Sequence, residues 1–476
     1  MDQFLFEYSD FCFGVLFRHG MIVANPVATL NFFKVSKFFV YAALFSVVFV
    51  NTETLFPFIV TKYVFLRVSV GLALIAFLLG LLFQSSGHPT SQMLRNARTS
   101  DVLKSPLVIA VSLFVLVFLL AGFFGFNPAN SFWSNFERGE GGFQMLTFFT
   151  FFLLLVFLFR DKKDWLGVFK ASLIASVFMI IYGFLAAFDV GGFIGVSLKI
   201  GERFQGSLGN TAYVGTYLLF SLFYSFYMLC GGFGKINRRF GKIILWSLVV
   251  LFLIIIWLTQ SRGPFLGLGA GIVAFLFIWG LGGSRRVKVA SISILIIATV
   301  FTSLLYTVRF SPVMQDLGFT RFFNITLDNL STQSRFWTWG AALEGFKEKP
   351  ILGWGPENFG RVFDEYFDTR HFIPSEASET WYDRAHNVFF DYLVETGILG
   401  LLSYIGIFIV FYLRFFKSAL IGKNQHQSVV PNALIFAMPV AYLVQGVVIF
   451  DVLPIYLNLF LFLAFANYGF SHEHSD

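Results

Sequence analysis

Long apolar stretches separated by short polar connections dominate the sequence. Twelve of them approach the roughly 20 apolar residues that a membrane-spanning helix needs. They lie at 34–52, 63–84, 106–126, 143–159, 166–188, 211–230, 242–259, 264–282, 288–307, 391–413, 430–450 and 454–470. The first, fourth and last are the weakest of the twelve. The pattern predicts an all-α polytopic membrane protein with about 12 transmembrane helices.

Composition agrees with this pattern. Hydrophobic residues make up 57% of the 476 residues and charged residues 13%, whereas a soluble chain carries about 25% charged residues. The net charge of +7 comes from basic residues scattered between apolar stretches, so we expect no nucleic-acid partner. Cys12 and Cys230 have no metal-type spacing, and we expect neither a disulfide nor a metal framework.

Basic residues mark every second connection between the predicted helices. They are Arg18, Lys34 and Lys37; Arg95, Arg98 and Lys104; Arg160, Lys162 and Lys163; Lys235, Arg238, Arg239 and Lys242; Arg285, Arg286 and Lys288; and Arg414, Lys417 and Lys423. Positively charged connections stay in the cytoplasm. The distribution therefore places both chain termini in the cytoplasm.

This orientation divides the chain into five parts. Residues 1–33 form a cytoplasmic or interfacial N-terminus, 34–308 hold nine transmembrane helices, and 391–470 hold three more. Residues 471–476 form a cytoplasmic tail. Between the two helical parts, 309–390 is a large extracytoplasmic loop, and a loop of this length is usually functional.

The outer loop is expected to carry short helices. The segment STQSRFWTWGAALEGF (331–346) has the pattern of an amphipathic helix, with Ser331 as its N-cap. Its predicted packing face consists of Phe336, Trp337, Gly340 and Ala341.

Two arginines lie at the outer ends of predicted transmembrane helices. Arg203 belongs to a glycine-containing outer connection, and Arg262 follows Gln260 and Ser261 directly before Pro264. Proline suits the first turn of a helix, whose free N–H groups and dipole bind anions. Guanidinium groups match phosphate oxygens and stay charged. We therefore predict that these residues bind a diphosphate, although an arginine that only anchors a helix at the interface has the same pattern.

A second polar cluster precedes the tenth predicted helix. Arg384, His386 and Asn387 lie at its entrance, and Asp383 is spaced to orient the imidazole if the segment is helical. A histidine near its usual pKa of about 6.5 suits proton removal from a hydroxyl. We predict His386 as a catalytic base, with Arg384 and Asn387 as substrate-binding residues; an interfacial histidine bound to water is the alternative. The aromatic rings expected to contact sugars or the membrane interface are Trp337, Trp339, Trp354, Trp381 and Tyr382.

Several segments together resemble the O-antigen ligase and polymerase superfamily. They are TQSRGPFLGLGAG (259–271), KPILGWGPENFG (349–360) and RAHNVFFDYLVETGILG (384–400), with SFWSNFERGEG (131–141) and ERFQGSLGN (202–210) before them. The resemblance implies an inverting, metal-independent glycosyltransferase without a cofactor. Such an enzyme moves a glycan from undecaprenyl diphosphate to a lipid or glycan acceptor outside the bacterial inner membrane.

The resemblance also implies roles for particular residues. Arg203 and Arg262 take the diphosphate-binding roles and His386 the base-like role, while Gly397 and Gly400 complete the histidine motif. The protein-glycosylating branch has Thr or Tyr at the next position, where this chain has Leu401, which disfavours a protein acceptor.

Two alternatives remain open. A polysaccharide polymerase would use the same site with a growing lipid-linked chain as donor. A transporter or flippase for a lipid-linked sugar should carry polar residues deep within several helices and internal repeats. The polar residues instead cluster at one side of the membrane, which favours an enzyme.

Overall fold

The computed structural model describes residues 31–83, 103–135, 137–187, 203–234, 239–316, 330–372, 380–421 and 429–472, and within these ranges it is helical, without a strand. Most of the expected interfacial N-terminus (1–33), most of the second basic connection and most of the C-terminal tail (471–476) lie outside the described residues.

Every one of the twelve predicted stretches forms helix. They correspond to α2 (Phe32–Leu44) with η1 (Phe45–Val48), α3 (Val60–Phe83), α6 (Pro106–Phe123), α8 (Gly142–Leu158), α9 (Lys162–Ala187), α10 (Thr211–Leu229), α11 (Arg239–Leu258), α12 (Arg262–Gly282), α13 (Arg285–Thr307), α18 (Val388–Ile421), α19 (Val429–Gly446) and α20 (Leu453–His472). Among the described helices, ten are long and apolar enough to cross a membrane. The shorter α2 and α8 are the first and fourth stretches. The all-α polytopic membrane fold is confirmed.

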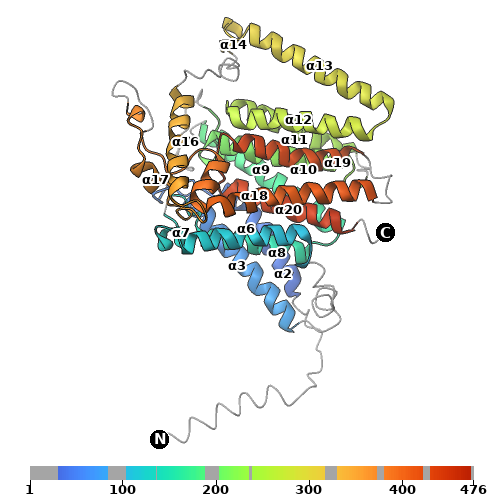
Figure 1. Ribbon diagram of the computed structural model, residues 1–476. Coiled ribbons are helices and arrows are strands. Elements are labelled where there is room, and N and C mark those ends of the chain that lie inside the picture. Colours follow the sequence, from blue (N-terminus) through green and yellow to red (C-terminus); the bar gives the residue numbers. More distant parts are fainter. Residues whose placement is uncertain are drawn as a thin grey trace, which may run out of the picture.

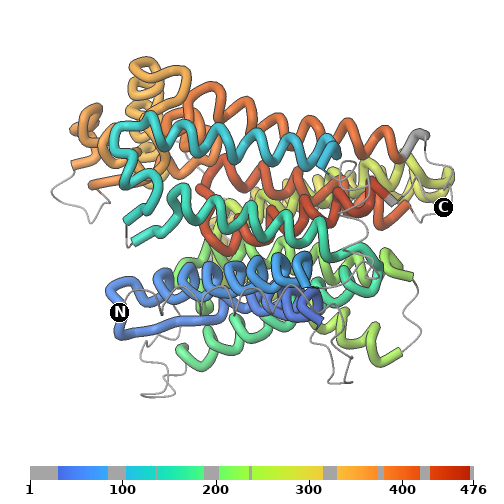
Figure 2. The backbone as a smooth tube through the Cα atoms, turned by 90° about the horizontal axis from the view of Figure 1, so that it is seen from below, coloured from blue at the N-terminus to red at the C-terminus, as the bar shows by residue number. Residues whose placement is uncertain are grey.

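The long helices lie side by side in one bundle (Figure 1). Three further helices gather at one end of it, namely α7 (Pro128–Trp133), α16 (Leu330–Glu348) and α17 (Phe359–Glu365). The view from below in Figure 2 shows the long helices running along a common direction, with α16 and α17 again at that end. We call this the outer end of the bundle, following the orientation expected from the sequence.

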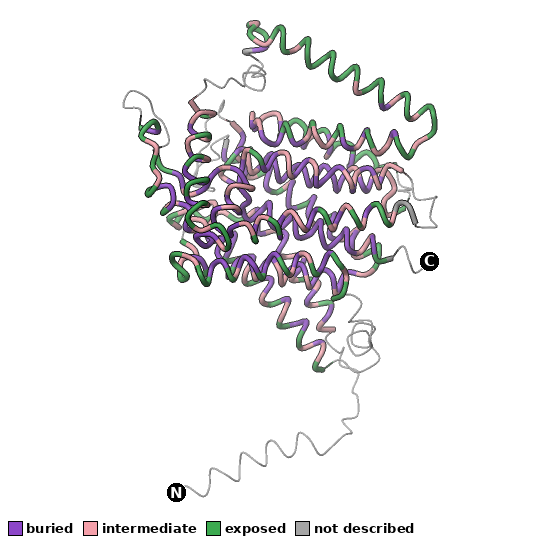
Figure 3. Tube along the Cα trace, in the orientation of Figure 1, coloured by how far each residue is buried: buried purple, intermediate pink, exposed green. Residues whose placement is uncertain are grey.

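Burial differs strongly between the helices. Helix α20 is buried along nearly its whole length, whereas α13 buries only Ser291. Figure 3 shows α13 as an almost continuously exposed helix at the edge of the bundle. Its exposed residues include Ile292, Ile296 and Val300. An exposed apolar helix of this kind suits contact with lipid tails.

The helices at the outer end have a small core of their own. It consists of Ala341, Ala342, Trp354, Phe359, Val362, Phe363, Tyr382, Ala385 and Val394. The predicted packing face of α16 was largely wrong, because the helix buries Ser334, Thr338, Ala341, Ala342 and Gly345 and leaves Phe336 46% exposed. Small side chains on the buried face let α16 approach its neighbours closely. The helix begins at Leu330, so Ser331 is not its N-cap.

Helix α18 is interrupted at Gly397, where φ is 64°. The segment 350–355 fits against this break. Trp354 N–H donates to the carbonyl of Val394, and Ile398 N–H donates to the carbonyl of Pro350, both at 2.9 Å. A Cβ atom at Gly397 would lie 2.3 Å from the carbonyl oxygen of Ile351. Only glycine fits both this conformation and this contact. This contact explains physically why the segments KPILGWGPENFG (349–360) and RAHNVFFDYLVETGILG (384–400) occur together.

Candidate active site

Two helix N-termini meet at the outer end of the bundle. Ser261 is the N-cap of α12, whose first residue is Arg262 and whose first turn contains Pro264, as predicted. Thr211 begins α10, and its Oγ1 lies 3.1 Å from Ser261 Oγ. The first turns of both helices carry N–H groups without partners inside the helix, so their dipoles point toward the same region. Such an arrangement favours an anion.

Arg203 is bound to the same place. Its Nε donates to the carbonyl of Thr259 and its Nη2 donates to Ser261 Oγ, each at 2.9 Å. Gln260, between these two partners, has a left-handed backbone with φ of 47°. The structure thus brings Arg203 to the turn that carries Gln260, Ser261 and Arg262, the other residues that the sequence analysis assigned to the diphosphate.

The turn between α19 and α20, residues 447–452, separates this cationic region from His386. Val448 lies against Gly263 in the first turn of α12. Val388 N–H donates to the carbonyl of Ile449 at 3.1 Å, and the ring of Phe450 lies 5.0 Å from the His386 ring. The start of α12 and His386 therefore flank one short turn, although about 120 residues separate them in the sequence.

His386 is held in an unusual conformation. Its backbone is left-handed, with φ of 54°, and its ring lies between those of Tyr382 and Phe450. Nδ1 lies 3.2 Å from the carbonyl oxygen of Arg384, so Nδ1 carries the proton of the neutral ring and Nε2 is the acceptor. Burial is the main reason that the pKa of His386 is lowered to about 4; the hydrogen bond to the carbonyl of Arg384 opposes this shift, and the charge of Arg335 contributes to it. The ring is neutral at pH 7.

Asp383 does not hold the imidazole, contrary to the sequence-based expectation. The segment 380–387 is not helical, so the predicted spacing does not apply. Arg138 binds both carboxylate oxygens of Asp383, at 2.6 and 2.9 Å, and its guanidinium lies over the Phe450 ring. Burial tends to raise the pKa of Asp383, but the bonds from Arg138 outweigh it and the pKa is lowered.

Arg384 lies in a buried cluster of charged side chains. It donates to Glu395 at 2.6 Å, forms an ion pair with Glu357, and lies 3.9 Å from Glu140. We call Arg384 and these three glutamates the acidic cluster. Burial raises the pKa of Glu140 to about 8. The guanidinium is thus surrounded by carboxylates of the protein itself.

Asn387 has a local structural partner as well. Its Oδ1 accepts hydrogen bonds from the N–H groups of Phe389 at 2.9 Å and Phe390 at 3.3 Å. Asn387 is therefore the N-cap of α18. Asparagine is a favoured residue at this position because it satisfies N–H groups that lack partners within the helix.

The five aromatic residues differ in their surroundings. Trp354 and Tyr382 are buried, and Trp337 packs edge-on against His371. Trp339 donates to the carbonyl of Ala385 at 2.9 Å, and so supports the loop beside His386. Trp381 is 49% exposed.

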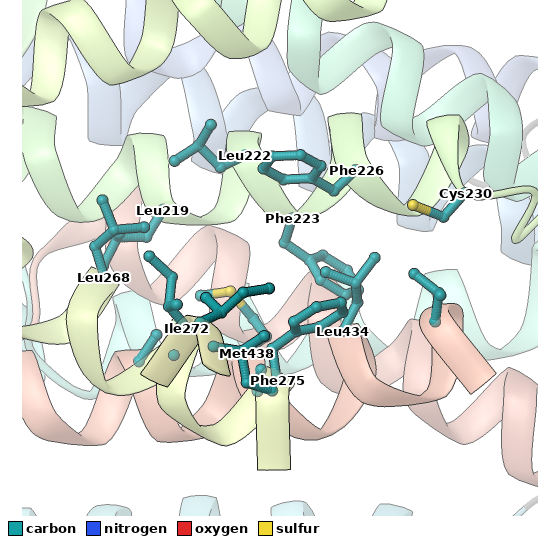
Figure 4. A pocket seen from close by; sticks show the side chains of 16 residues that line it. Leu219, Leu222, Phe223, Phe226, Cys230, Leu268, Ile272, Phe275, Leu434 and Met438 are labelled. Atoms are coloured by element: carbon teal, nitrogen blue, oxygen red, sulfur yellow. The ribbon is translucent and has the colours of Figure 1, made fainter. Parts of the chain in front are cut away.

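An apolar cavity lies below the cationic region, between α10, α12, α13 and α19 (Figure 4). Its volume is about 320 Å³. Leu268, Ile272 and Phe275 of α12 line it, together with Leu219 and Met438. Leu268 is six residues beyond Arg262, about 9 Å along the helix axis. One helix thus joins a cationic end to an apolar cavity.

Sequence reasoning missed several residues around the site. Arg138, Glu140, Arg335, Glu395 and Phe450 were not singled out. A usable signal existed for Glu395, because a carboxylate within a predicted transmembrane stretch is costly and tends to be functional. Within the described residues, no group of three or more His, Cys, Asp and Glu side chains is arranged to hold a metal ion.

Comparison with known proteins gives one match. No curated protein matches the chain. Residues 247–405, about a third of the chain, match the family model described as O-antigen ligase. The matched range contains Arg262, α16, α17 and His386, whereas Arg203 and α7 lie before it. Residues 247–405 are thus similar to the O-antigen ligase family, in agreement with the predicted resemblance to the O-antigen ligase and polymerase superfamily.

Proposed function

We propose that this protein is a glycosyltransferase that moves a glycan from undecaprenyl diphosphate to a hydroxyl of a lipid or glycan acceptor. One observation carries the proposal. The N-termini of α10 and α12, with Arg203 and Arg262, meet on one flank of the turn 447–452, and His386 lies on the other flank.

The cationic region suits the leaving group. When the bond between the sugar carbon and the phosphate oxygen breaks, negative charge develops on the diphosphate. Arg203, Arg262 and the two helix N-termini supply fixed positive charge at that place. Ser261 and Gln260 belong to the same turn and contribute polar groups. These groups neutralise the diphosphate in a reaction that we propose to be metal-independent.

His386 suits the acceptor side of the reaction. The acceptor oxygen attacks the sugar carbon from the face opposite the diphosphate, which inverts the configuration there. The hydroxyl proton passes to Nε2 of His386, because Nδ1 faces the carbonyl of Arg384. The bond to the diphosphate breaks, and undecaprenyl diphosphate leaves.

The apolar cavity suits the lipid part of the donor. A polyprenyl chain is long and apolar, and its diphosphate is charged, so the donor needs a cationic end beside an apolar surface. Helix α12 provides both, with Arg262 at its N-terminus and Leu268, Ile272 and Phe275 along the cavity. We propose that the first isoprene units lie there.

Arg384 and Asn387, predicted from the sequence to bind substrate, have a positioning role in this proposal. Arg384 neutralises buried glutamates, and Asn387 caps α18. Both residues flank His386 in the chain, so their contacts fix the backbone that presents the imidazole.

The positive-inside pattern supports an orientation in the bacterial inner membrane. Both termini lie in the cytoplasm in this proposal, and α16 and α17 lie outside. The reaction then takes place at the extracytoplasmic face, where the acceptor is available.

Transfer by purified protein tests the proposal, with donor binding measured separately. His386→Asn is the sharpest variant, because asparagine tolerates the left-handed backbone but cannot act as a base at pH 7. We expect a loss of roughly 10²–10⁴-fold in rate with unchanged donor binding. Arg262→Lys keeps the charge but loses the guanidinium geometry, and we expect weaker donor binding and slower transfer.

Three outcomes would contradict the proposal. Near-wild-type transfer by folded His386→Asn would exclude the base. Wild-type donor binding by Arg262→Lys would reduce Arg262 to an interfacial anchor. Transfer that a chelator abolishes and Mg²⁺ restores would exclude the metal-independent reaction. The length of the products distinguishes the ligase from a polymerase, because only a polymerase extends the donor chain.

A further inference from the structure

A second cavity opens at the outer end of the bundle. It borders the N-terminus of α10, which the proposed function assigns to the diphosphate, but its other lining residues have no role in the proposed reaction. Its volume is about 230 Å³, and we call it the outer cavity. Its polar lining comes from Lys62, Arg138, Glu140, Asn210 and Tyr213. Tyr213 also lies 5.9 Å from the ring of Phe450, so the outer cavity lies near His386, across that ring.

Lys62 is the unusual member of this lining. It is only 3% exposed, and its Nζ donates one hydrogen bond, to the carbonyl oxygen of Phe49 at 2.7 Å. Among the described residues, no carboxylate oxygen lies within 4.0 Å of this ammonium group. Buried ammonium groups are costly unless they are paired, and Lys62 has two further N–H donors.

Other charges at the outer cavity do not neutralise Lys62. Glu140 also lines it, but its Oε1 accepts from Leu453 N–H at 2.8 Å and its Oε2 faces Arg384 at 3.9 Å. Arg138 adds a guanidinium that is already paired with Asp383.

The N-terminus of α10 adds to the positive field. Asn210 is its N-cap and lines the outer cavity beside Gly209. This helix has 19 residues, so its dipole is well developed, and its first N–H groups lie at the cavity edge. Phe56, Phe58 and Pro454 form apolar walls, which strengthen electrostatic attraction by excluding water.

We infer that the outer cavity binds a phosphate group of a substrate, with Lys62 as its principal ligand and the N-terminus of α10 as a second. The inference rests on the proposed function, because it adds an anion subsite to the same reaction. The phosphate belongs either to the acceptor or to the donor, and these two sources share the same recognition chemistry.

Binding of inorganic pyrophosphate to the purified full-length protein, followed by calorimetry, tests the inference. Lys62→Met removes the charge at similar length, and Lys62→Arg retains it. Lys347→Met is the matched control, since Lys347 is an exposed lysine on α16 that pairs with Glu344. We expect two sites in the wild type. Lys62→Met should weaken one of them at least tenfold, Lys62→Arg should weaken it less, and Lys347→Met should leave both unchanged.

Kinetics identify the source of the phosphate. In Lys62→Met, the KM for one substrate should rise at least fivefold while kcat changes little, and that substrate carries the phosphate. Unchanged pyrophosphate binding together with unchanged KM values in folded Lys62→Met would overturn the inference. A lower melting temperature with normal pyrophosphate binding would also overturn it, because Lys62 would then serve only to hold Phe49.

Failure of the proposed function gives a different result. In that case Arg262→Lys and His386→Asn would transfer normally, whatever happens at Lys62. Loss of one of the two pyrophosphate sites in Lys62→Met alone would still support phosphate binding in the outer cavity.

Discussion

Replacement of Arg384 by methionine tests whether this residue holds the protein together or binds substrate. Its guanidinium is 8% exposed and faces Glu140, Glu357 and Glu395, which are 7%, 2% and 5% exposed. Methionine has a similar reach but no charge, so Arg384→Met leaves three buried carboxylates without their cation. Breaking a buried ion pair from one side costs about 3–5 kcal/mol, and we expect a destabilisation of that size at pH 7.5.

The destabilisation caused by Arg384→Met should depend on pH. Burial raises the pKa of Glu140 to about 8 even beside Arg384, and loss of the guanidinium raises it further, so the variant loses stability as pH rises. At pH 5 Glu140 is protonated, and the difference from the wild type should shrink. Thermal unfolding in detergent at pH 5 and 7.5 measures both differences.

A second substitution makes the test sharper. Glu395→Gln removes one of the unpaired carboxylates and keeps its shape, so the double variant should be more stable than the sum of the single effects predicts. The reasoning is refuted if Arg384→Met melts like the wild type at both pH values and yet binds donor poorly. Arg384 would then be a substrate-binding residue, as the sequence alone suggested.

Three further predictions follow from the same region. Because burial lowers the pKa of His386 to about 4, kcat/KM should rise through about pH 4 in the free enzyme and show no step near 6.5; a step near 6.5 that is absent from His386→Asn would contradict this. Burial raises the pKa of Glu140 to about 8, whereas its pKa in the unfolded chain is about 4.3. Between these two pH values the folded protein retains a proton that the unfolded chain releases. Glu140 therefore lowers the free energy of unfolding by about 1.4 kcal/mol per pH unit up to about pH 8. Glu140→Gln should remove part of the fall in melting temperature between pH 6.5 and 8, and an unchanged slope would exclude the assignment. In a background without native cysteines, an impermeant reagent added outside should label Glu344→Cys but not Ser284→Cys, and the reverse pattern would overturn the proposed orientation.

The helices were predictable because lipid offers no hydrogen-bond partners to the backbone. Each stretch of about 20 apolar residues must satisfy its own backbone hydrogen bonds, and only a helix does so locally. The buried face of α16 was not predictable in this way. Its packing depends on Ala341, Ala342 and Gly345, whose small size matters only once the neighbouring segments are placed. A ranking of residues by hydrophobicity alone would bury Phe336 before these small residues, whereas the structure buries the small residues and exposes Phe336.

Residues of the candidate site could be proposed from the sequence only where a chemically suitable side chain lies at the end of an apolar stretch. Arg262 and His386 each lie at the end of an apolar stretch, where a charged or titratable group is unexpected. The acidic cluster could not be assembled in the same way, because Glu140 and Glu395 are far apart in the sequence and meet through three-dimensional packing. The pairing of Asp383 with Arg138 instead of His386 was unpredictable for the same reason, since Arg138 reaches Asp383 from another loop.

Backbone strain connects the acidic cluster to the proposed chemistry. The non-glycine residues with left-handed backbones in the described part of the chain are Ser134, Gln260, Glu357 and His386, and each such conformation costs about 1–3 kcal/mol. Ser134 donates to Glu357 at 2.6 Å, and Glu357 pairs with Arg384, whose carbonyl faces Nδ1 of His386. The buried ion pairs of the acidic cluster therefore stabilise left-handed backbone conformations that an unconstrained loop would not keep. In the proposed function, a base held in this way has its acceptor atom oriented before substrate binds, which lowers the reorganisation needed during the reaction.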